Sequence, residues 1–174
     1  MQAAMRADAQ ASSPVAEREH EDAGQGQDDA SSPATDTGAN PRPVAEESTA
    51  CRGRIGYVSP DDGHCYFFLR EPITWHMARD ECANNMAHLA TLTSNSEQAF
   101  VTSFGAEAEA WIGLSRFGAV NFTWVTNEIF AYTQWQQDRP EPRQESAVVM
   151  TPITGLWSDR SPDELHQALC ETEP

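Results

Sequence analysis

The sequence predicts one α+β domain over residues 51–174, and three observations lead to that class. Two helical patterns come first along the chain, and short apolar runs of strand length follow them. The run Trp111-Ile112-Gly113-Leu114 is bulky and apolar, as is typical of a buried central strand. All five tryptophans lie between residues 75 and 157, as expected where successive strands contribute to one core. A segment of this length buries roughly two thirds of its unfolded surface, which is enough for a single core.

Residues 1–50 differ sharply in composition from the rest of the chain. They contain ten Asp and Glu against three Arg, and no aromatic residue. Such a segment cannot bury enough apolar surface to offset the loss of chain entropy. We therefore predict a disordered acidic tether over residues 1–50. The alternative is a segment that folds on a partner.

Charge and hydropathy narrow the classes of partner. The formal net charge is -16, and no stripe of basic residues is present to neutralise phosphates, so we expect no nucleic-acid partner. No apolar run is as long as a membrane span needs, so we expect no membrane span. Residues 1–10 also lack the apolar core of a secretion signal.

Four cysteines, an even number in a small domain, favour two disulfides and an oxidising compartment. The expected location is therefore secreted, cell-surface or periplasmic. Three pairings are arithmetically possible. A zinc site that uses His64 beside Cys65 is the alternative, but the cysteine spacings lack the close pairs of usual zinc sites. The cysteines are Cys51, Cys65, Cys82 and Cys170.

The first elements are a hairpin and a strand. Between Cys51 and Cys65 the turn signal Pro60-Asp61-Asp62-Gly63 predicts a hairpin, and the apolar run of residues 65–69 predicts the strand that follows. A bridge between the two cysteines would pin this hairpin to that strand.

Two helices follow. Thr74 can cap a helix in which Trp75, Ala78, Cys82 and Met86 share the buried face. After an extended segment at residues 88–92, Ser94-Asn95-Ser96-Glu97 has the pattern of a capping box. The second helix is predicted to run from this box to about Phe104, with Gly105 as the stop signal.

The C-terminal half alternates strands with a polar loop. Residues 136–146 are polar, carry two prolines and mix arginines with acids, so we expect a loop there. A loop held between strands is where binding residues commonly lie. Besides residues 111–114, the predicted strands are residues 122–125, 147–150, 156–158 and 167–170.

The order of these motifs resembles the C-type lectin-like domain family across nearly all of residues 51–174. The resemblance implies two helices packed on mixed, mostly antiparallel strands, with an irregular long-loop region. The residues that carry it are Cys65-Tyr66, Trp75 with Ala78 and Cys82, His88-Leu89-Ala90-Thr91-Leu92, Trp111-Ile112-Gly113-Leu114, Phe122 with Trp124, Tyr132 with Trp135, Gly155 with Trp157 and Asp159, and Leu169-Cys170-Glu171.

The resemblance also implies how the cysteines pair. Cys82 is expected to pair with Cys170, and Cys51 with Cys65 looks like the N-terminal hairpin of the family's longer form. The family's second core disulfide would fall at Ala147 and Pro162, and neither is cysteine. The long loop therefore lacks a covalent link, and we expect it to be mobile.

Sugar binding in the family uses a calcium ion held by a Glu-Pro-Asn or Gln-Pro-Asp triplet, a later Glu and an Asn-Asp pair. In this chain the triplet falls on Arg139-Pro140-Glu141, the later acid on Glu145 and the pair on Ser158-Asp159. A shift of register gives Glu141-Pro142-Arg143, which also contains an arginine. The carboxylates Glu141, Glu145 and Asp159 would be the metal ligands.

An arginine opposes calcium at this place. A guanidinium about 5 Å from a divalent ion costs on the order of 6 kcal/mol at an effective dielectric constant near 20. We therefore expect Arg139 or Arg143 to take the place of the ion and to pair with Glu145 or Asp159. No cofactor is expected, with calcium as the less favoured possibility.

The predicted function is non-catalytic recognition of a glycan or protein ligand, without obligatory calcium. The loop at 136–146 and the strand around 157–159 would form the surface, with candidate ligand contacts at Arg139, Glu141, Arg143, Glu145, Ser158 and Asp159. The first alternative is a calcium-dependent carbohydrate-binding lectin. The second is a structural module without a discrete ligand.

An enzyme is the remaining alternative. Glu141 and Glu145 suggest at most a carboxylate pair for glycoside cleavage, and the sequence has no nucleophile elbow, phosphate loop or metal-binding histidine pair. We therefore predict that the protein is not an enzyme. Four histidines have no acid at a recognisable spacing, and we interpret them as surface or core residues: His64, His76, His88 and His166.

Overall fold

The computed structural model describes residues 48–51, 53–142 and 145–174. The first strand begins at Ser48, three residues before the expected domain boundary at Cys51. The rest of the predicted tether lies outside the described residues. The elements are β1 Ser48–Cys51, β2 Arg54–Val58, β3 Cys65–Ile73, α1 Trp75–Asn84, β4 His88–Leu89, α2 Asn95–Thr102, β5 Ala110–Phe117, β6 Thr123–Trp124, β7 Glu145–Met150, β8 Trp157–Arg160 and β9 His166–Thr172.

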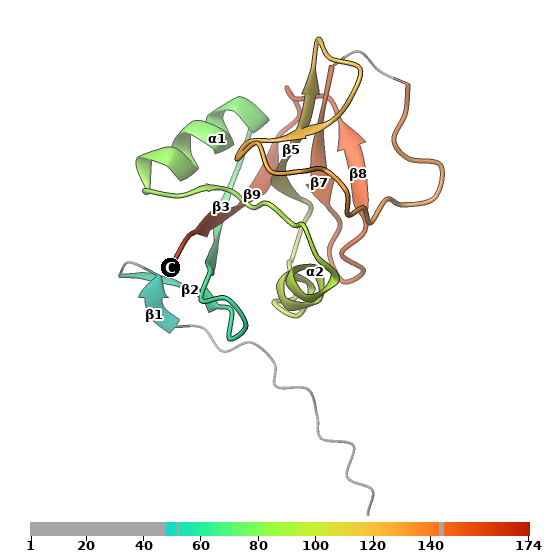
Figure 1. Cartoon of the computed structure of the whole chain (residues 1–174). Coiled ribbons are helices and arrows are strands. Elements are labelled where there is room, and N and C mark those ends of the chain that lie inside the picture. The colour runs from blue at the N-terminus through green and yellow to red at the C-terminus, as the bar shows by residue number, and fades with distance from the viewer. Residues whose placement is uncertain (1–47, 52, 143–144) are drawn as a thin grey trace, which may run out of the picture. The chain divides into compact units, whose positions relative to one another are not determined.

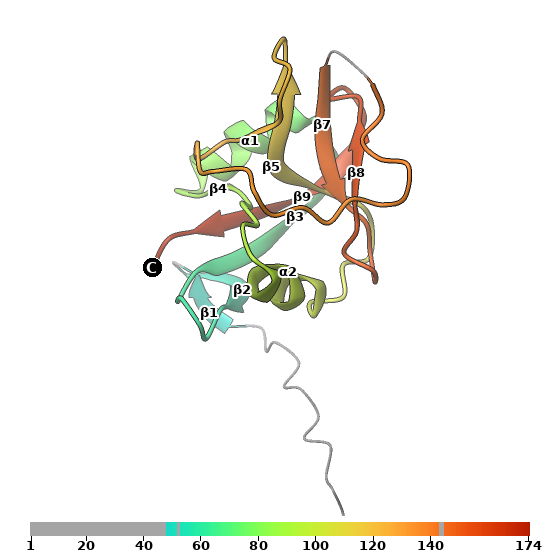
Figure 2. The same ribbon diagram turned by 45° about the vertical axis from the view of Figure 1, so that its right-hand side comes forward.

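The strands form one sheet in the order β1-β2-β3-β9-β5-β7-β8, with β4 also paired to β9 and β6 to β5. The pair β5–β9 is parallel and the other pairs are antiparallel. The β1–β2 hairpin and the C-terminus lie at one end of the domain, and β7 and β8 lie at the other (Figures 1 and 2). This confirms the predicted class of two helices on a mixed, mostly antiparallel sheet.

Helix α1 begins where the capping signal predicts. The side chain of Thr74 accepts a hydrogen bond from the N–H of Met77 at 3.3 Å, and Trp75, Ala78 and Cys82 are buried. The prediction for Met86 is wrong, because its side chain is 68% exposed. The helix ends at Asn84 and Met86 has φ of 56°, so the helical periodicity that would place it on the buried face no longer applies.

Helix α2 has the predicted capping box, with Ser94 and Glu97 each accepting a hydrogen bond from the other's backbone N–H. It ends at Thr102, two residues before the expected end, and Gly105 follows with φ of 66°. The buried Gln98 fixes this helix to the far strands, because its Nε2 donates to Gly155 O at 3.0 Å. Its Oε1 accepts from Trp157 Nε1 at 2.8 Å.

Strand β5 passes through the centre of the core. The indole of Trp111 donates to Ile73 O at 2.8 Å. Gly113 is required by close approach, since a Cβ there would lie 2.7 Å from Leu89 O and 2.8 Å from Val125 Cγ2. Two buried clusters flank this strand, one rich in aromatic rings around Trp124 and the other around the Cys82–Cys170 disulfide.

Both expected disulfides are present. Cys51 pairs with Cys65, and Cys82 pairs with Cys170, with Cα–Cα distances of 5.4 and 5.6 Å. All four cysteines are in disulfides, so no thiolate is available for the alternative zinc site. The second bridge joins α1 to β9 in the interior, whereas the first ties the start of the hairpin to β3.

Candidate functional site

The polar loop begins against β8. Trp135 forms a bridge with Trp157, and the N–H of Gln136 donates to Trp157 O at 2.8 Å. The N–H of Trp157 in turn donates to Gln134 O at 2.7 Å. The two indole rings pack edge to face with centroids 5.8 Å apart. These contacts direct the chain after Trp135 along β8 and bring the following residues to Asp159.

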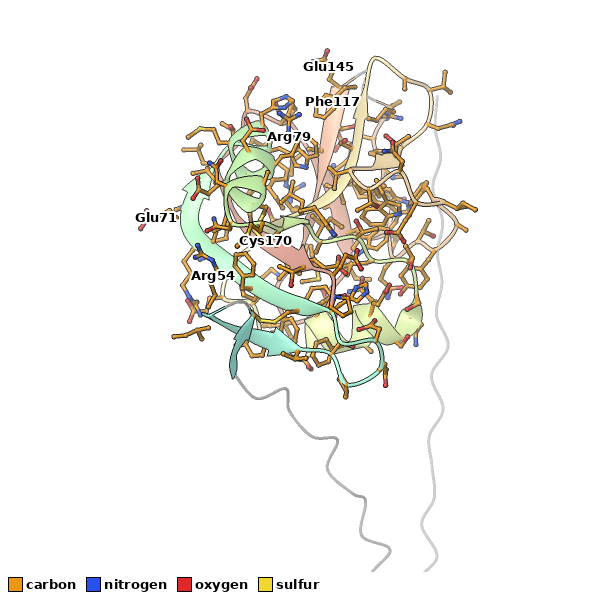
Figure 3. The ribbon with its side chains drawn as sticks, turned by 60° about the vertical axis from the view of Figure 1, so that its left-hand side comes forward. Arg54, Glu71, Arg79, Phe117, Glu145 and Cys170 are labelled. Atoms are coloured by element: carbon orange, nitrogen blue, oxygen red, sulfur yellow. A yellow bond between two sulfur atoms is a disulfide. The ribbon has the colours of Figure 1, made fainter. Side chains whose placement is uncertain are left out.

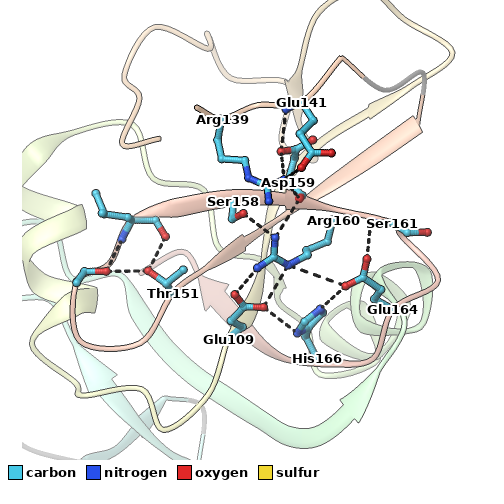
Figure 4. Close-up of polar contacts among 12 residues, drawn as sticks. Glu109, Arg139, Glu141, Thr151, Ser158, Asp159, Arg160, Ser161, Glu164 and His166 are labelled. Carbon is cyan, nitrogen blue, oxygen red and sulfur yellow. Dashed lines mark hydrogen bonds and ion pairs between the residues drawn. The ribbon is translucent and has the colours of Figure 1, made fainter. Parts of the chain in front are cut away.

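Arg139, Glu141 and Asp159 form a compact polar cluster (Figure 4). The Nη1 of Arg139 lies 3.2 Å from Asp159 Oδ1 and 2.6 Å from Glu141 Oε1. The backbone N–H of Glu141 also donates to Asp159 Oδ1 at 3.0 Å. One guanidinium is therefore shared by two carboxylates that come from different segments of the chain.

Because its side chain is buried, Asp159 needs the positive charge of the Arg139 guanidinium. Its side chain is fully buried, and its Oδ2 has no hydrogen-bond partner. A buried carboxylate without a countercharge is strongly destabilising. Arg139 is 23% exposed, so its positive charge lies close enough to the interior to compensate the aspartate.

A second arginine ties the middle of the loop to its C-terminal end. From β5, the Nη2 of Arg116 donates to Glu141 O at 3.2 Å and to Ser146 Oγ at 3.3 Å. Its guanidinium also lies 4.7 Å from the centroid of the Phe122 ring. Sequence reasoning missed Arg116, because no spacing signal connects a strand residue to a loop so far along the chain.

The other predicted site residues are placed differently. Ser158 is buried on β8, where its Oγ accepts from Arg160 Nη1 at 2.8 Å. Glu145 is exposed at the start of β7, in register with Phe117 of β5 (Figure 3). Strand β7 therefore includes the last two residues of the predicted loop, Glu145 and Ser146. Arg143 lies outside the described residues.

A second ionic network holds the turn at residues 161–165 (Figure 4). The Nη2 of Arg160 lies 2.6 Å from Glu109 Oε1. The ring of His166 lies between Glu109 Oε2 at 3.5 Å and Glu164 Oε2 at 3.4 Å. Pro162, where the family's second core disulfide would be, accepts a hydrogen bond from the N–H of Trp75 at 3.0 Å. Noncovalent contacts therefore secure this turn.

Calcium, which the resemblance implies, does not fit the described residues. The guanidinium of Arg139 engages Asp159 Oδ1 and Glu141 Oε1, two of the oxygens that an ion would need. Within residues 48–51, 53–142 and 145–174, no three His, Cys, Asp or Glu side chains are grouped so that they could hold a metal. The expected ligand set of Glu141, Glu145 and Asp159 is thus not assembled.

An apolar hollow of the described surface lies elsewhere, between β3 and α1. Its volume is about 510 Å³, and Phe68, Ile73 and Met77 supply most of its apolar lining. None of the predicted ligand contacts lines it. The polar loop and this apolar hollow are therefore separate features of the domain.

The chain forms a small, disulfide-bonded α+β domain with a long irregular loop beside β8. The chain belongs to the family described as Lectin C-type domain, whose model matches residues 71–172. The family is non-catalytic, which removes the glycosidase alternative. Neither described helix has the length and apolar character that crossing a membrane requires.

Two curated relatives illustrate the range of similarity. Human C-type lectin domain family 4 member G is 34% identical over 117 residues, which is 63% of this chain and 40% of the relative. The chain thus spans less than half of that relative's length. Lectin BRA-3 of Megabalanus rosa is 29% identical over 134 residues, which is 74% of this chain and 82% of that lectin.

Solved structures share the fold. The carbohydrate-recognition domain of cow CD23, in the presence of a GlcNAc2Man3 oligosaccharide, is 30% identical with a TM-score of 0.59, covering 64% of this chain and 88% of that one. The C-type lectin domain of murine dendritic cell inhibitory receptor 2, in complex with an N-glycan, is 27% identical with a TM-score of 0.58, covering 64% and 91%.

Proposed function

We propose that this domain recognises a glycan or protein ligand without obligatory calcium, through the loop at 136–146 and the strand around 157–159. Arg139, Glu141 and Asp159 form the centre of the proposed surface, with Arg143, Glu145 and Ser158 as the remaining candidate contacts. The alternative is a calcium-dependent lectin that uses the same loop.

One observation carries the proposal. The guanidinium of Arg139 lies 3.2 Å from Asp159 Oδ1 and 2.6 Å from Glu141 Oε1, so a charge built into the chain stands where an ion would neutralise these acids. Binding a divalent ion here would require the arginine to leave and would bring two positive groups together. These contacts support the proposal that the loop is held without an ion.

The ligand class is proposed from the relatives. The cow CD23 domain was solved in the presence of an oligosaccharide, and the murine dendritic cell receptor domain in complex with an N-glycan. Two disulfides suit an oxidising environment, so we infer that the domain acts outside the cytosol, either secreted or displayed at a surface.

A glycan array probed with and without a calcium chelator tests the proposal. Signal that survives the chelator supports recognition without calcium, whereas signal that disappears supports the alternative lectin. Calcium titration of the purified chain by calorimetry gives the second readout. We expect no heat of binding at micromolar concentrations, and a micromolar affinity would refute the role given to Arg139.

A matched pair of variants distinguishes recognition by the loop from nonspecific binding. Arg139→Gln removes the central charge, while Arg79→Gln removes an exposed arginine that pairs with Asp80 on α1. If the loop is the binding surface, array signal falls in the first variant and persists in the second. Equal signal in both would place recognition elsewhere on the domain.

A further inference from the structure

Two histidines and two glutamates from distant segments form a closed ring on one face of the sheet. Glu171 of β9 stands in register with Tyr66 of β3 on one side and with His88 of β4 on the other. His64 immediately precedes β3, and Glu173 immediately follows β9. We call His64, Glu171, His88 and Glu173 the histidine–glutamate ring.

Both nitrogens of His64 face carboxylates. Its Nδ1 lies 2.6 Å from Glu171 Oε1, and its Nε2 lies 3.0 Å from Glu173 Oε2. A carboxylate only accepts hydrogen bonds, and an imidazole carries an N–H on both nitrogens only when it is protonated. The geometry therefore matches an imidazolium held between two acceptors.

Both nitrogens of His88 also face oxygen acceptors. Its Nδ1 lies 3.0 Å from Leu89 O, and its Nε2 lies 3.4 Å from Glu173 Oε1. The Nε2 atom is buried and makes no hydrogen bond, although an acceptor stands close to it. A proton on this nitrogen would give it a donor role toward Glu173, whereas its lone pair would repel that carboxylate.

The remaining charged and titratable groups around the ring also favour a protonated imidazole at His64. Glu171 is 2% exposed, and its oxygens accept from Tyr66 OH at 3.1 Å and from the N–H of Thr91 at 2.8 Å. From its own turn, Asp62 accepts the backbone N–H of His64 at 2.9 Å. Burial raises the pKa of Tyr66, and the negative charges of Glu171 and of Glu97 on α2 raise it further, so this phenol stays protonated.

The pKa directions agree with the geometry. Burial lowers the pKa of His64, but the hydrogen bond of Glu171 and the negative charges of Glu171, Asp62 and Glu173 together raise that pKa above 6.5. Burial raises the pKa of the Glu171 carboxyl, and the N–H of Thr91 and the neighbouring histidines offset this only in part. Both shifts mean that the folded ring holds protons more tightly than the unfolded chain does.

We propose that the histidine–glutamate ring is a protonation-dependent clasp that fixes the turn between β2 and β3 to the C-terminal end of β9. Its stabilisation is complete below the unfolded histidine pKa near 6.5 and is lost as pH rises through the raised pKa of His64. Above that pH the imidazole of His64 keeps one N–H, and the 59% exposed Glu173 turns toward solvent.

The clasp acts at the hairpin end of the domain. Figures 1 and 2 place the C-terminus beside the β1–β2 hairpin and away from β7 and β8. The proposal is therefore independent of ligand recognition by the loop. It concerns how firmly the turn between β2 and β3 is held to the C-terminal end of β9 at low pH.

Thermal unfolding of the disulfide-intact chain between pH 8.5 and 6.0 tests the clasp. We expect the Tm of the wild type to rise by roughly 3–6 °C as pH falls across this range. His64→Gln should lose most of the rise, and Glu173→Gln should lose a smaller part of it, because Glu171 raises the His64 pKa more than Glu173 does. His76→Gln is the matched control, because this exposed histidine packs on the Phe117 ring of β5, and it should keep the full rise.

Histidine titration by NMR gives a residue-specific readout on the same samples. The pKa of His64 should lie above its ordinary value of 6.5 in the wild type and fall in Glu173→Gln. If His64→Gln fails to fold, Glu173→Gln decides the matter, since its exposed side chain tolerates substitution. A pH slope in Glu173→Gln equal to that of the wild type, or a His64 pKa at or below 6.5, would overturn the proposal.

Discussion

Arg139 and Asp159, twenty residues apart in the chain, meet at 3.2 Å between Nη1 and Oδ1. The aspartate is fully buried and the arginine is largely covered, so the pair places a compensating charge inside the loop region rather than on its surface. This contact joins the start of the loop to β8. It is the contact on which the proposed calcium-independent recognition rests.

The Arg139–Asp159 pair should contribute measurably to stability. In a double-mutant cycle of Arg139→Gln and Asp159→Asn, urea unfolding is expected to give a coupling free energy of about 1–3 kcal/mol, because the buried carboxylate loses its countercharge. The exposed pair Arg79–Asp80, at 2.7 Å, is the control and should give less than about 0.5 kcal/mol. Equal coupling in the two pairs would argue against a buried ionic contact.

Arg116 should limit opening of the polar loop. Its hydrogen bonds to Glu141 O and Ser146 Oγ are charge-assisted, and losing them is expected to raise the open population roughly tenfold. Arg116→Gln should therefore increase the rate of tryptic cleavage after Arg143, followed by mass spectrometry. Arg79→Gln should leave that rate unchanged, and an unaltered rate in Arg116→Gln would show that other contacts hold the loop.

Gly113 should tolerate no side chain. Gly113→Ala places a Cβ 2.7 Å from the Leu89 carbonyl oxygen, and we expect a loss of about 2–3 kcal/mol of unfolding free energy. Gly105→Ala is the control, since its Cβ meets open space and only its φ of 66° opposes alanine, at a cost of about 1 kcal/mol. Chemical denaturation distinguishes them, and equal losses would contradict the close approach.

The two disulfides should differ in their contribution to stability. The bridge Cys82–Cys170 closes a separation of 88 residues, and its removal by paired alanine substitution should cost about 4–5 kcal/mol. The bridge Cys51–Cys65 closes 14 residues, and its removal should cost about 3 kcal/mol. If denaturant unfolding shows a larger loss of unfolding free energy for removal of Cys51–Cys65 than of Cys82–Cys170, chain entropy does not set the difference.

Local signals predicted the elements well because they depend on neighbouring residues. Thr74 and the Ser94–Glu97 box cap the two helices as expected, since a cap satisfies backbone groups within one turn. The same reasoning failed for Met86, where the chain leaves the helix before its periodicity reaches that residue. The position of a helix end depends on the path of the following segment through the fold, and the local sequence pattern does not contain that information.

The site was predictable only in part. Arg139, Glu141 and Asp159 were named from their positions relative to the tryptophans, and the structure brings them together. Arg116 and the partners of His64 and His88 were not found, because their contacts join strands far apart in sequence. The interpretation of His64 and His88 as simple surface or core residues overlooked Glu171 and Glu173.

By itself the sequence determined the helix caps, the apolar strand runs and the acidic composition of the first fifty residues. The tertiary structure decided which charges meet: Arg139 with Asp159, Arg116 with the loop backbone, and two histidines with two glutamates at the C-terminal end of the chain. The physical reason is range. Caps and periodicity act within a few residues of one segment, whereas an ion pair forms only after folding has set strand register and excluded water around the charges.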